Sequence, residues 1–431
     1  MNFLISSGNK IANEGKISRF RLKNSLDVIL MSDASTPIVA VNVWYKVGSK
    51  DEPKGKSGFA HLFEHMMFQG SANVGKAEHM KLINDVGGWM NGTTSKDRTN
   101  YFEVVPSNQL KLALWLEADR MKSLAVTVEN FENQRSTVKE ERRLRIDNAP
   151  YTPVFYELLD ELTYENWAYK HSVMGSMQDL DNAKIEDVIK FHQTYYKPNN
   201  AILSIVGDID EKETLEIVKK CFEDIPAGSP PPGVDLTEPE QNSEKRMTWQ
   251  DRFAPMAGYA CSYHVPRYGH QDAYCLELIE NLLFDGESSR IYQRLVEKDK
   301  SAQHIYANLD LKIGPGTFIF FGQVKPGSSI SQIEKGIGEE LTRLRETIIT
   351  EQEFRKLKNK IKAEYVNKME RVHYVADLLN KYTFIFDDPE LIFSEIDAYE
   401  KISRDTIMEV ANKYFDNKNR NVIEILPAPK N

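Results

Sequence analysis

Residues 57–70, SGFAHLFEHMMFQG, combine ionisable and apolar residues in a pattern that predicts a short buried helix. Ser57 can cap the start of this helix and Gly70 can end it, and neither glycine nor proline interrupts positions 59–68. On such a helix His61 and His65 lie one turn apart on the same face, with Glu64 beside them. Nearly all the other positions are apolar, as expected for a helix surrounded by the protein core.

Two histidines and a carboxylate on a buried helix need compensation, because burying polar and charged groups is unfavourable unless they are paired or bind a cation. A catalytic zinc takes three protein ligands and one water, and histidines at i and i+4 supply two of the three. Glu64 is placed to take a proton from the metal-bound water. The order H-x-x-E-H is the signature of the inverted zincins. The alternative is a pair of core histidines bonded to backbone carbonyls.

A third ligand has to be acidic or a histidine and has to come from another element. Residues 132–145, ENQRSTVKEERRLR, predict a charged helix. One stripe of this helix, at spacings of three and four, is expected to face inward and consists of Phe131, Gln134, Val138, Glu141 and Leu144. Glu140 is rotated by about 100° from Glu141 and is expected to face solvent or pair with a nearby arginine. Glu141, which follows His65 by 76 residues, is therefore the candidate third ligand.

With His61, Glu64, His65 and Glu141 at these spacings, the chain resembles the pitrilysin (insulinase-type) family of zinc metallopeptidases. Within that family it is most similar to the branch of the mitochondrial processing peptidases and their bacterial relatives. The resemblance implies that His61, His65 and Glu141 bind one Zn²⁺ per chain and that Glu64 is the general base. Manganese and cobalt are alternatives for the metal.

A hairpin is predicted after a second helix at 76–86, with strands at 87–95 and 99–105 and a turn at 96–98. In the family that the chain resembles, the first of these strands is an exposed edge to which a substrate peptide adds as a further strand. Main-chain hydrogen bonds then bind the peptide without sequence preference. The resemblance assigns this role to Asn91, Gly92, Thr93 and Thr94. The alternative is a plain hairpin.

The next predicted helix, residues 109–121 (QLKLALWLEADRM), is amphipathic and carries one glutamate among apolar residues. This residue, Glu117, is expected either to hydrogen-bond a metal-bound histidine from outside the ligand set or to be an ordinary surface glutamate.

The chain of 431 residues is long enough for more than one domain. Residues 225–245 are rich in proline, glycine and acidic residues and carry no periodicity. We therefore predict a zinc-binding catalytic domain at 1–226, a linker at 227–245 and a homologous non-catalytic domain at 246–431.

The second half repeats the first. At an offset of 216 residues, Glu277 falls on His61, Glu280 on Glu64 and Asn281 on His65. We expect an α+β fold with two homologous α/β domains, each a mostly antiparallel sheet of about six strands flanked by helices. Only the first domain retains a metal triad.

Composition and charge exclude several classes of function. The net charge of −9 arises from 55 basic and 64 acidic residues without a long basic stretch, which argues against nucleic acid as a partner. No transmembrane stretch is present, so no membrane partner is expected. No signal peptide is recognisable, so we expect a cytoplasmic location, or a periplasmic one if a signal peptide had been removed.

One stretch departs from the pattern of the family. Residues 286–295, GESSRIYQRL, match a turn that opens a helix in the family. Self-sufficient members carry an arginine just after this stretch and a tyrosine seven residues later, a pair that binds the substrate carbonyl. Here Val296 and Gln303 stand at those places, and Tyr306 is near but out of step. The resemblance therefore implies a homologous partner subunit that lacks zinc and supplies the missing pair, with a homodimer as the alternative.

These features predict a zinc-dependent endopeptidase that cleaves flexible peptides or oligopeptides in an enclosed chamber, completed by a partner subunit. Glu64 is expected to deprotonate the attacking water and then to protonate the leaving amine. The alternatives are a catalytically inactive scaffold or binding subunit of a larger complex and a self-sufficient homodimeric peptidase. Inactive members of the family usually lose a ligand or the base, whereas all four residues persist here, which favours an enzyme.

Overall fold

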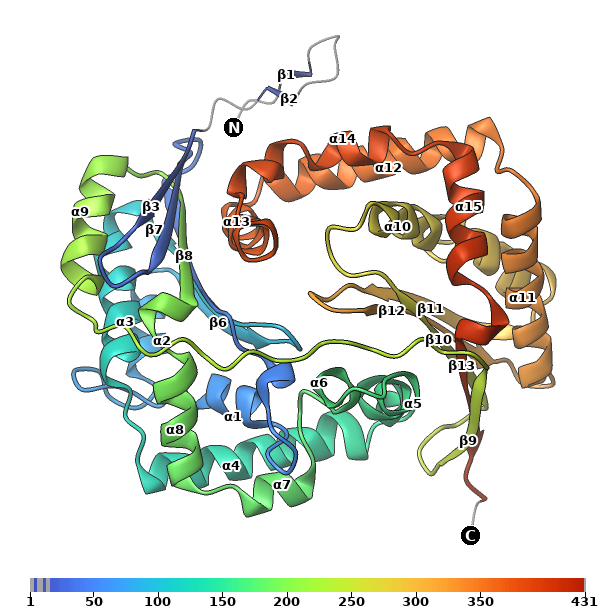
Figure 1. Ribbon diagram of the computed structural model, residues 1–431, viewed down its shortest axis with the longest axis horizontal. Helices are drawn as coiled ribbons and strands as arrows, with labels where there is room; N and C mark the ends of the chain where they lie inside the picture. The colour runs from blue at the N-terminus through green and yellow to red at the C-terminus, as the bar shows by residue number, and fades with distance from the viewer. Residues whose placement is uncertain (1–3, 6–10, 13–15, 430–431) are drawn as a thin grey trace. The chain divides into compact units, whose positions relative to one another are not determined.

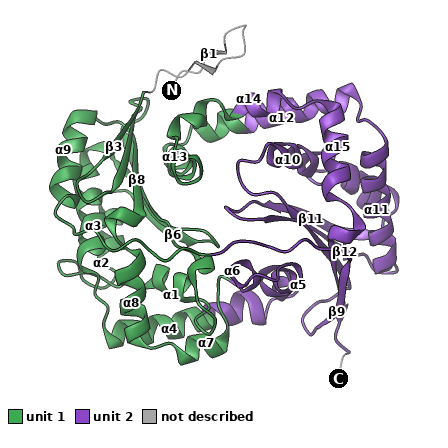
Figure 2. Cartoon of the chain, in the orientation of Figure 1, with its two compact units in different colours: residues 1–140, 173–234, 365–395 green, residues 141–172, 235–364, 396–431 purple. Residues whose placement is uncertain are grey.

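The computed structural model describes residues 4–5, 11–12 and 16–429, and its internal contacts divide the chain into two compact units (Figure 1, Figure 2). Unit 1 consists of Met1–Glu140, Val173–Val234 and Tyr365–Glu395, and unit 2 of Glu141–Ser172, Asp235–Glu364 and Ile396–Asn431. The predicted division at 227–245 follows the internal repeat along the chain, whereas the units follow contacts in space. The boundaries at 1–226 and 246–431 therefore stay a prediction about the repeat.

Unit 1 is built on a six-stranded sheet in the order β3-β4-β8-β5-β7-β6. Only β4 and β8 run parallel, and the other neighbours are antiparallel. The β-branched run at 38–45 is the strand β5, and it is buried from Val39 to Tyr45 because both faces of the sheet are covered. The predicted hairpin is formed by β6 and β7, with β6 at the edge of the sheet. The strands are β3 (Ile17–Arg21), β4 (Asp27–Ser32), β5 (Ile38–Tyr45), β6 (Trp89–Thr94), β7 (Thr99–Pro106) and β8 (Ala201–Gly207).

Helices cover both faces of this sheet (Figure 1). On one face, α3 (Leu110–Ser123) packs on β5 and α9 (Glu211–Phe222) packs on β4. On the other, α13 (Val372–Phe386) lies along β5 and β8. Asp377 of α13 accepts hydrogen bonds from Trp44 Nε1 at 2.9 Å and Asn100 Nδ2 at 3.2 Å, which fixes this helix to the sheet. The other α-helices lying wholly or mainly in unit 1 are α1 (Phe59–Met66), α2 (Glu78–Asp85), α4 (Val128–Arg142), α7 (Met177–Asn182) and α8 (Ile185–Tyr195).

Helix α1 corresponds to the predicted buried helix, but its start differs from the prediction. The predicted cap, Ser57, is wrong, because its hydroxyl donates to Asp179 at 2.5 Å and Gly58 is the residue that precedes the helix, with φ 88°. The buried carboxylate of Glu52 caps the helix instead, accepting from Gly58 N at 2.9 Å and Ala60 N at 2.6 Å. A Cβ at position 58 would also lie 2.8 Å from the carbonyl oxygen of Met174, so glycine is required there.

Unit 2 repeats the strand order of unit 1. Its sheet runs β11-β12-β10-β13-β9, which matches β6-β7-β5-β8-β4 in unit 1. Each sheet has one parallel pair, and the two pairs are equivalent: β13 with β9 in unit 2 and β8 with β4 in unit 1. The strands are β9 (Lys245–Asp251), β10 (Gly258–Val265), β11 (Ala302–Asp310), β12 (Gly316–Val324) and β13 (Arg420–Pro427). No strand of the described part of unit 2 corresponds to β3, so this sheet has five strands. The predicted fold of two homologous, mostly antiparallel α/β domains is confirmed.

The helices of unit 2 include the counterpart of α1. This is α10 (Gln271–Leu283), which carries Glu277, Glu280 and Asn281. The others that lie wholly or mainly in unit 2 are α5 (Leu159–Thr163), α6 (Trp167–Lys170), α11 (Ile330–Glu346), α12 (Glu351–Met369), α14 (Glu395–Glu400) and α15 (Arg404–Tyr414).

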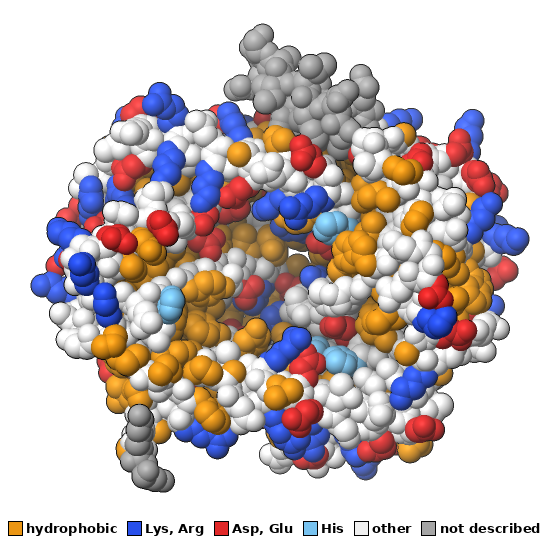
Figure 3. Space-filling view, turned by 180° about the vertical axis from the view of Figure 1, so that it is seen from behind, with side chains coloured by type: hydrophobic (Ala, Val, Ile, Leu, Met, Phe, Trp, Pro, Cys, Tyr) orange, Lys and Arg blue, Asp and Glu red, His pale blue; other side chains and the backbone are white. Residues whose placement is uncertain are grey.

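The surface charge and the helices agree with the absence of a basic stretch and of a transmembrane stretch in the sequence. On the face drawn in Figure 3, acidic and basic side chains are interspersed instead of forming one continuous basic area. Within the described residues, no helix has the length and apolar character needed to cross a bilayer.

Candidate metal centre and active site

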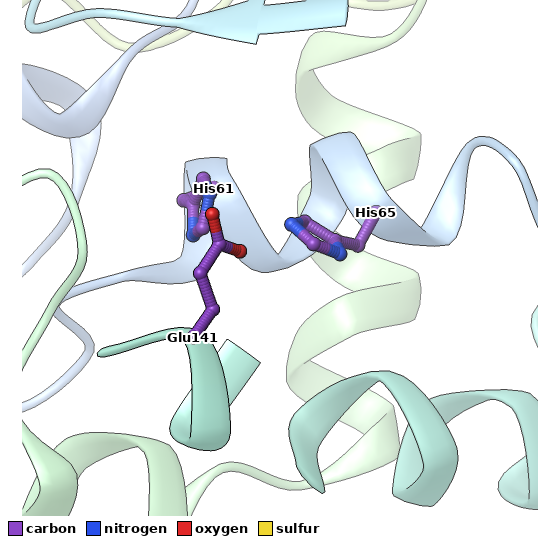
Figure 4. A group of neighbouring side chains, drawn as sticks. All are labelled: His61, His65 and Glu141. Atoms are coloured by element: carbon purple, nitrogen blue, oxygen red, sulfur yellow. The ribbon is translucent and has the colours of Figure 1, made fainter. Parts of the chain in front are cut away.

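The two histidines of the H-x-x-E-H pattern lie on one face of α1. Leu62, Phe63 and Met66 on the same helix are buried in the core of unit 1. His61 is 8% exposed, and His65 is partly exposed. The two imidazole rings are 4.8 Å apart between centroids and are inclined by 73° (Figure 4). A nitrogen of each ring lies within 4.8 Å of the other, as the spacing predicts.

Glu141 reaches these histidines from the last turn of α4, a helix that belongs to unit 1 up to Glu140. Ligand atoms of His61, His65 and Glu141 all lie within 4.8 Å of one another (Figure 4). Glu141 Oε1 also lies 3.0 Å from the guanidinium of Arg145, a largely exposed side chain. The structure therefore brings together the three residues that the sequence predicts as metal ligands.

The stripe predicted along α4 is confirmed over most of its length. Phe131, Gln134 and Val138 are buried, and Glu140 is exposed. The prediction is wrong for Leu144, which is 65% exposed. The α-helix ends at Arg142 and continues as a π-helical turn at Arg143–Asp147, whose wider turns rotate later residues away from the stripe.

The donor set fits a catalytic zinc ion. Two imidazole nitrogens and one carboxylate oxygen are the ligand types of known catalytic zinc sites, which keep a fourth position for water. Residues from two helices approach one point, and partial exposure of His65 and Glu141 leaves that point accessible. The group therefore has the composition and placement that a hydrolytic metal site requires.

Glu64 lies on α1 beside the two histidines and meets the edge strand β6. Thr94 Oγ1 donates a hydrogen bond to Glu64 Oε2 at 2.5 Å. Gly92, two residues earlier on the same strand, lies over the Glu64 side chain, where an added Cβ would be 3.3 Å from Glu64 Cγ. On the other face of the strand, Thr93 Oγ1 donates to Asn100 Oδ1 at 2.6 Å, and Asn91 is exposed.

The sequence of the chain matches two family models. The model described as insulinase (peptidase family M16) matches residues 27–177, and the model described as the peptidase M16 inactive domain matches residues 182–361. The zinc protease PqqE of Helicobacter pylori is 31% identical over 94% of this chain and 92% of its own length. The chain belongs to peptidase family M16.

Two further similar proteins agree with this assignment. The crystal structure of a protease from Helicobacter pylori has a TM-score of 0.92 and 30% identity, covering 96% of this chain and 100% of that one. A probable mitochondrial-processing peptidase subunit beta of Arabidopsis thaliana is 22% identical over 98% of this chain and 81% of its own length. The predicted pitrilysin (insulinase) family and its processing-peptidase relatives are thereby confirmed.

Unit 2 carries no counterpart of the metal triad among the residues that the structure describes. The groups of three potential ligands found in residues 16–429 are His61, His65 and Glu141, and a second group in unit 1. At the equivalent place on α10, Glu277 accepts from the Tyr399 hydroxyl at 2.5 Å and Glu280 accepts from Leu309 N at 3.0 Å. The M16 inactive-domain model matches residues 182–361, a range that includes α10.

The second group, His79 with Glu103 and Glu117, forms a buried charge network that the sequence analysis missed. His79 on α2 hydrogen-bonds Glu103 on β7, and Glu117 on α3 pairs through both carboxylate oxygens with Arg120. The guanidinium of Arg120 also lies 4.4 Å from the ring centroid of Tyr101. Glu117 is fully buried, so the surface alternative for this residue is wrong. Its role as an outer partner of a metal-bound histidine stays a prediction, because its recorded partners belong to this network.

Burial dominates the ionisation of the network. It raises the pKa of Glu103 and that of Glu117 to about 7, and it lowers the pKa of His79 to about 3. Burial therefore favours an uncharged imidazole at His79 and neutral carboxyl groups at Glu103 and Glu117. The positive charge of Arg120 opposes this effect of burial at both carboxyl groups.

Replacing Arg120 with methionine removes the only cation of this network. We expect the substitution Arg120→Met to lower the free energy of unfolding by about 3–5 kcal/mol, because it leaves Glu117 buried without its partner. The matched control is Lys219→Met on α9, which breaks an exposed pair with Glu216 at the same i,i+3 spacing and should cost less than about 1 kcal/mol. Urea unfolding followed by circular dichroism measures both, and equal losses would contradict this account.

Proposed function

We propose that the chain is a zinc-dependent endopeptidase that cleaves flexible peptides or oligopeptides. His61, His65 and Glu141 would hold one Zn²⁺ ion, and Glu64 would act as general base. The observation that carries the proposal is the convergence of these three side chains within 4.8 Å, with Glu64 on the same helix beside an edge strand. Relatives named zinc proteases support it.

The chemistry of the site follows from its residues. Bound zinc would supply a water whose pKa is lowered to about 7 and a positive charge for the substrate carbonyl oxygen. The Glu64 carboxylate accepts a proton from the attacking water and delivers it to the nitrogen of the leaving amine. Helix α1, held in place by the Glu52 cap and its apolar residues, fixes the base relative to both histidines.

The peptide would bind along β6. This strand is the edge of its sheet, so its outward main-chain groups are not used by another strand of unit 1. Residues 91–94 would pair with an extended peptide through the main chain, which favours flexible substrates over folded ones. We further propose that a partner subunit helps to enclose the site in a chamber.

The partner would be a homologous subunit that lacks zinc. Val296 and Gln303 stand where self-sufficient relatives carry an arginine and a tyrosine, and Tyr306 lies nearby on β11, half exposed. One relative is itself named as a subunit of a processing peptidase, which supports a heteromeric enzyme. A homodimer is the alternative arrangement.

Metal binding is tested by substituting two adjacent glutamates. Glu141→Gln keeps the shape of the side chain but removes a charged ligand, so we expect zinc affinity to fall more than about 100-fold. Losing a residue that only hydrogen-bonds a ligand lowers metal affinity about 10–100-fold. Glu140→Gln on the same helix, with an exposed side chain, should keep wild-type affinity. Zinc is measured by competition with a chromogenic chelator. Equal affinity of both variants would refute the assignment of Glu141 as a ligand.

Catalysis is tested by Glu64→Gln with a quenched fluorescent peptide. We expect turnover to fall about 10²–10⁴-fold with zinc content unchanged, because the base is lost and the ligands remain. The assay is run on the chain alone and together with its zinc-free homologue, and Glu140→Gln is the control. Turnover only in the mixture supports the partner, and turnover by the chain alone would refute that requirement. A Glu64→Gln variant as active as the wild type would refute the role of the base.

A further inference from the structure

Strand β6 contacts the proposed base directly. Thr94 Oγ1 on β6 donates to Glu64 Oε2 on α1 at 2.5 Å, a link between residues 30 positions apart. The terminal torsion of a glutamate is broad, so packing alone does not fix the direction of its carboxylate. A short hydrogen bond to a charged oxygen does fix it.

The strand approaches α1 this closely because Gly92 has no side chain. Side chains two residues apart on a strand lie on the same face, so position 92 and Thr94 both face the helix. A Cβ at Gly92 would lie 3.1 Å from Tyr101, 3.2 Å from Phe68 and 3.3 Å from Glu64. With glycine there, the strand packs against α1 and the Thr94 hydroxyl reaches the carboxylate.

Thr94 itself is held by the neighbouring strand. It pairs with Thr99 in the ladder between β6 and β7, and Thr99 Oγ1 donates to Val47 O at 2.9 Å. One residue earlier, the carbonyl oxygen of Thr93 accepts from Arg98 Nη1 at 2.9 Å. The end of β6 is therefore fixed before any peptide binds.

Unit 2 shows the same relation at the position equivalent to the base. Glu280 on α10 corresponds to Glu64, and its Oε1 accepts a hydrogen bond at 3.0 Å from the backbone N–H of Leu309 on β11, the counterpart of β6. The edge strand thus holds a carboxylate in both units: β6 does so through a threonine hydroxyl, and β11 does so through a backbone N–H.

We infer that Thr94 is a positioning residue for Glu64. Its side chain holds the base by a hydrogen bond, and only its main chain binds the peptide. The inference rests on the proposed function, since it takes Glu64 as the base. By holding Oε2, the hydroxyl sets the rotation of the carboxylate and so the direction in which the other oxygen, Oε1, faces the attacking water. The strand that aligns the peptide thereby also aligns the base.

The test compares Thr94→Val, which keeps the shape without the hydroxyl, with Thr94→Ser, which keeps the hydroxyl. In the complex that turns over peptide, we expect Thr94→Val to lower kcat about 10–100-fold with KM changed less than about twofold. Thr94→Ser should stay within about threefold of wild type. Thr137→Val, on the exposed side of α4, is the matched control with wild-type kinetics. A raised KM with unchanged kcat would overturn the inference, because it would make the side chain a substrate contact.

A second readout does not depend on activity. In crystals of the zinc-loaded chain, we expect Glu64 Oε2 to stay within hydrogen-bond distance of residue 94 in the wild type and in Thr94→Ser, and the carboxylate to rotate in Thr94→Val. An unrotated carboxylate in Thr94→Val would overturn the inference. If the wild type failed to cleave any peptide, the proposed function would fall, and these crystals would still decide whether Thr94 positions Glu64.

Discussion

The burial of helix α1 is the constraint on which the rest of the site depends. The helix carries two histidines and a glutamate, yet its other residues lie in the core of unit 1. Three residues outside the helix make its position possible. Glu52 caps its first N–H groups, Gly58 allows the close turn before it, and Glu141 brings a carboxylate to the histidines from α4. A divalent cation among these ligands would balance the charge of the Glu141 carboxylate.

The two units combine a repeated fold with different side chains at the place of the metal ligands. Both sheets have the same strand order, and α10 occupies the place of α1. In unit 2 the histidine positions hold Glu277 and Asn281, and the glutamates there are bound by a tyrosine hydroxyl and a backbone N–H. Burial raises the pKa of Glu280, the residue equivalent to Glu64, to about 7. This position on α10 therefore disfavours a charged carboxylate when no cation is bound beside it. Since the five strands that the two sheets share have the same order, the difference between the units at this place lies in the side chains.

Much of the fold and of the site could be predicted because the signals are local. The β-branched run at 38–45, the hairpin at 89–105 and the i,i+4 histidines each depend on neighbours in sequence. What the sequence could not supply depends on residues far apart in the chain. The cap of α1 comes from Glu52 rather than Ser57, and Leu144 turns outward at a π-helical turn that no periodicity reveals. The His79–Glu103 pair and the bond from Thr94 to Glu64 join different elements, so neither has a signature in one segment.

The most direct test of the account is the position of the metal. Crystals grown with one equivalent of Zn²⁺ would be measured on both sides of the zinc absorption edge, so that anomalous difference density locates the ion. The account predicts one strong peak per chain, about 2 Å from a nitrogen of His61, a nitrogen of His65 and an oxygen of Glu141. A peak at the His79–Glu103–Glu117 network, or no peak beside α1, would contradict it.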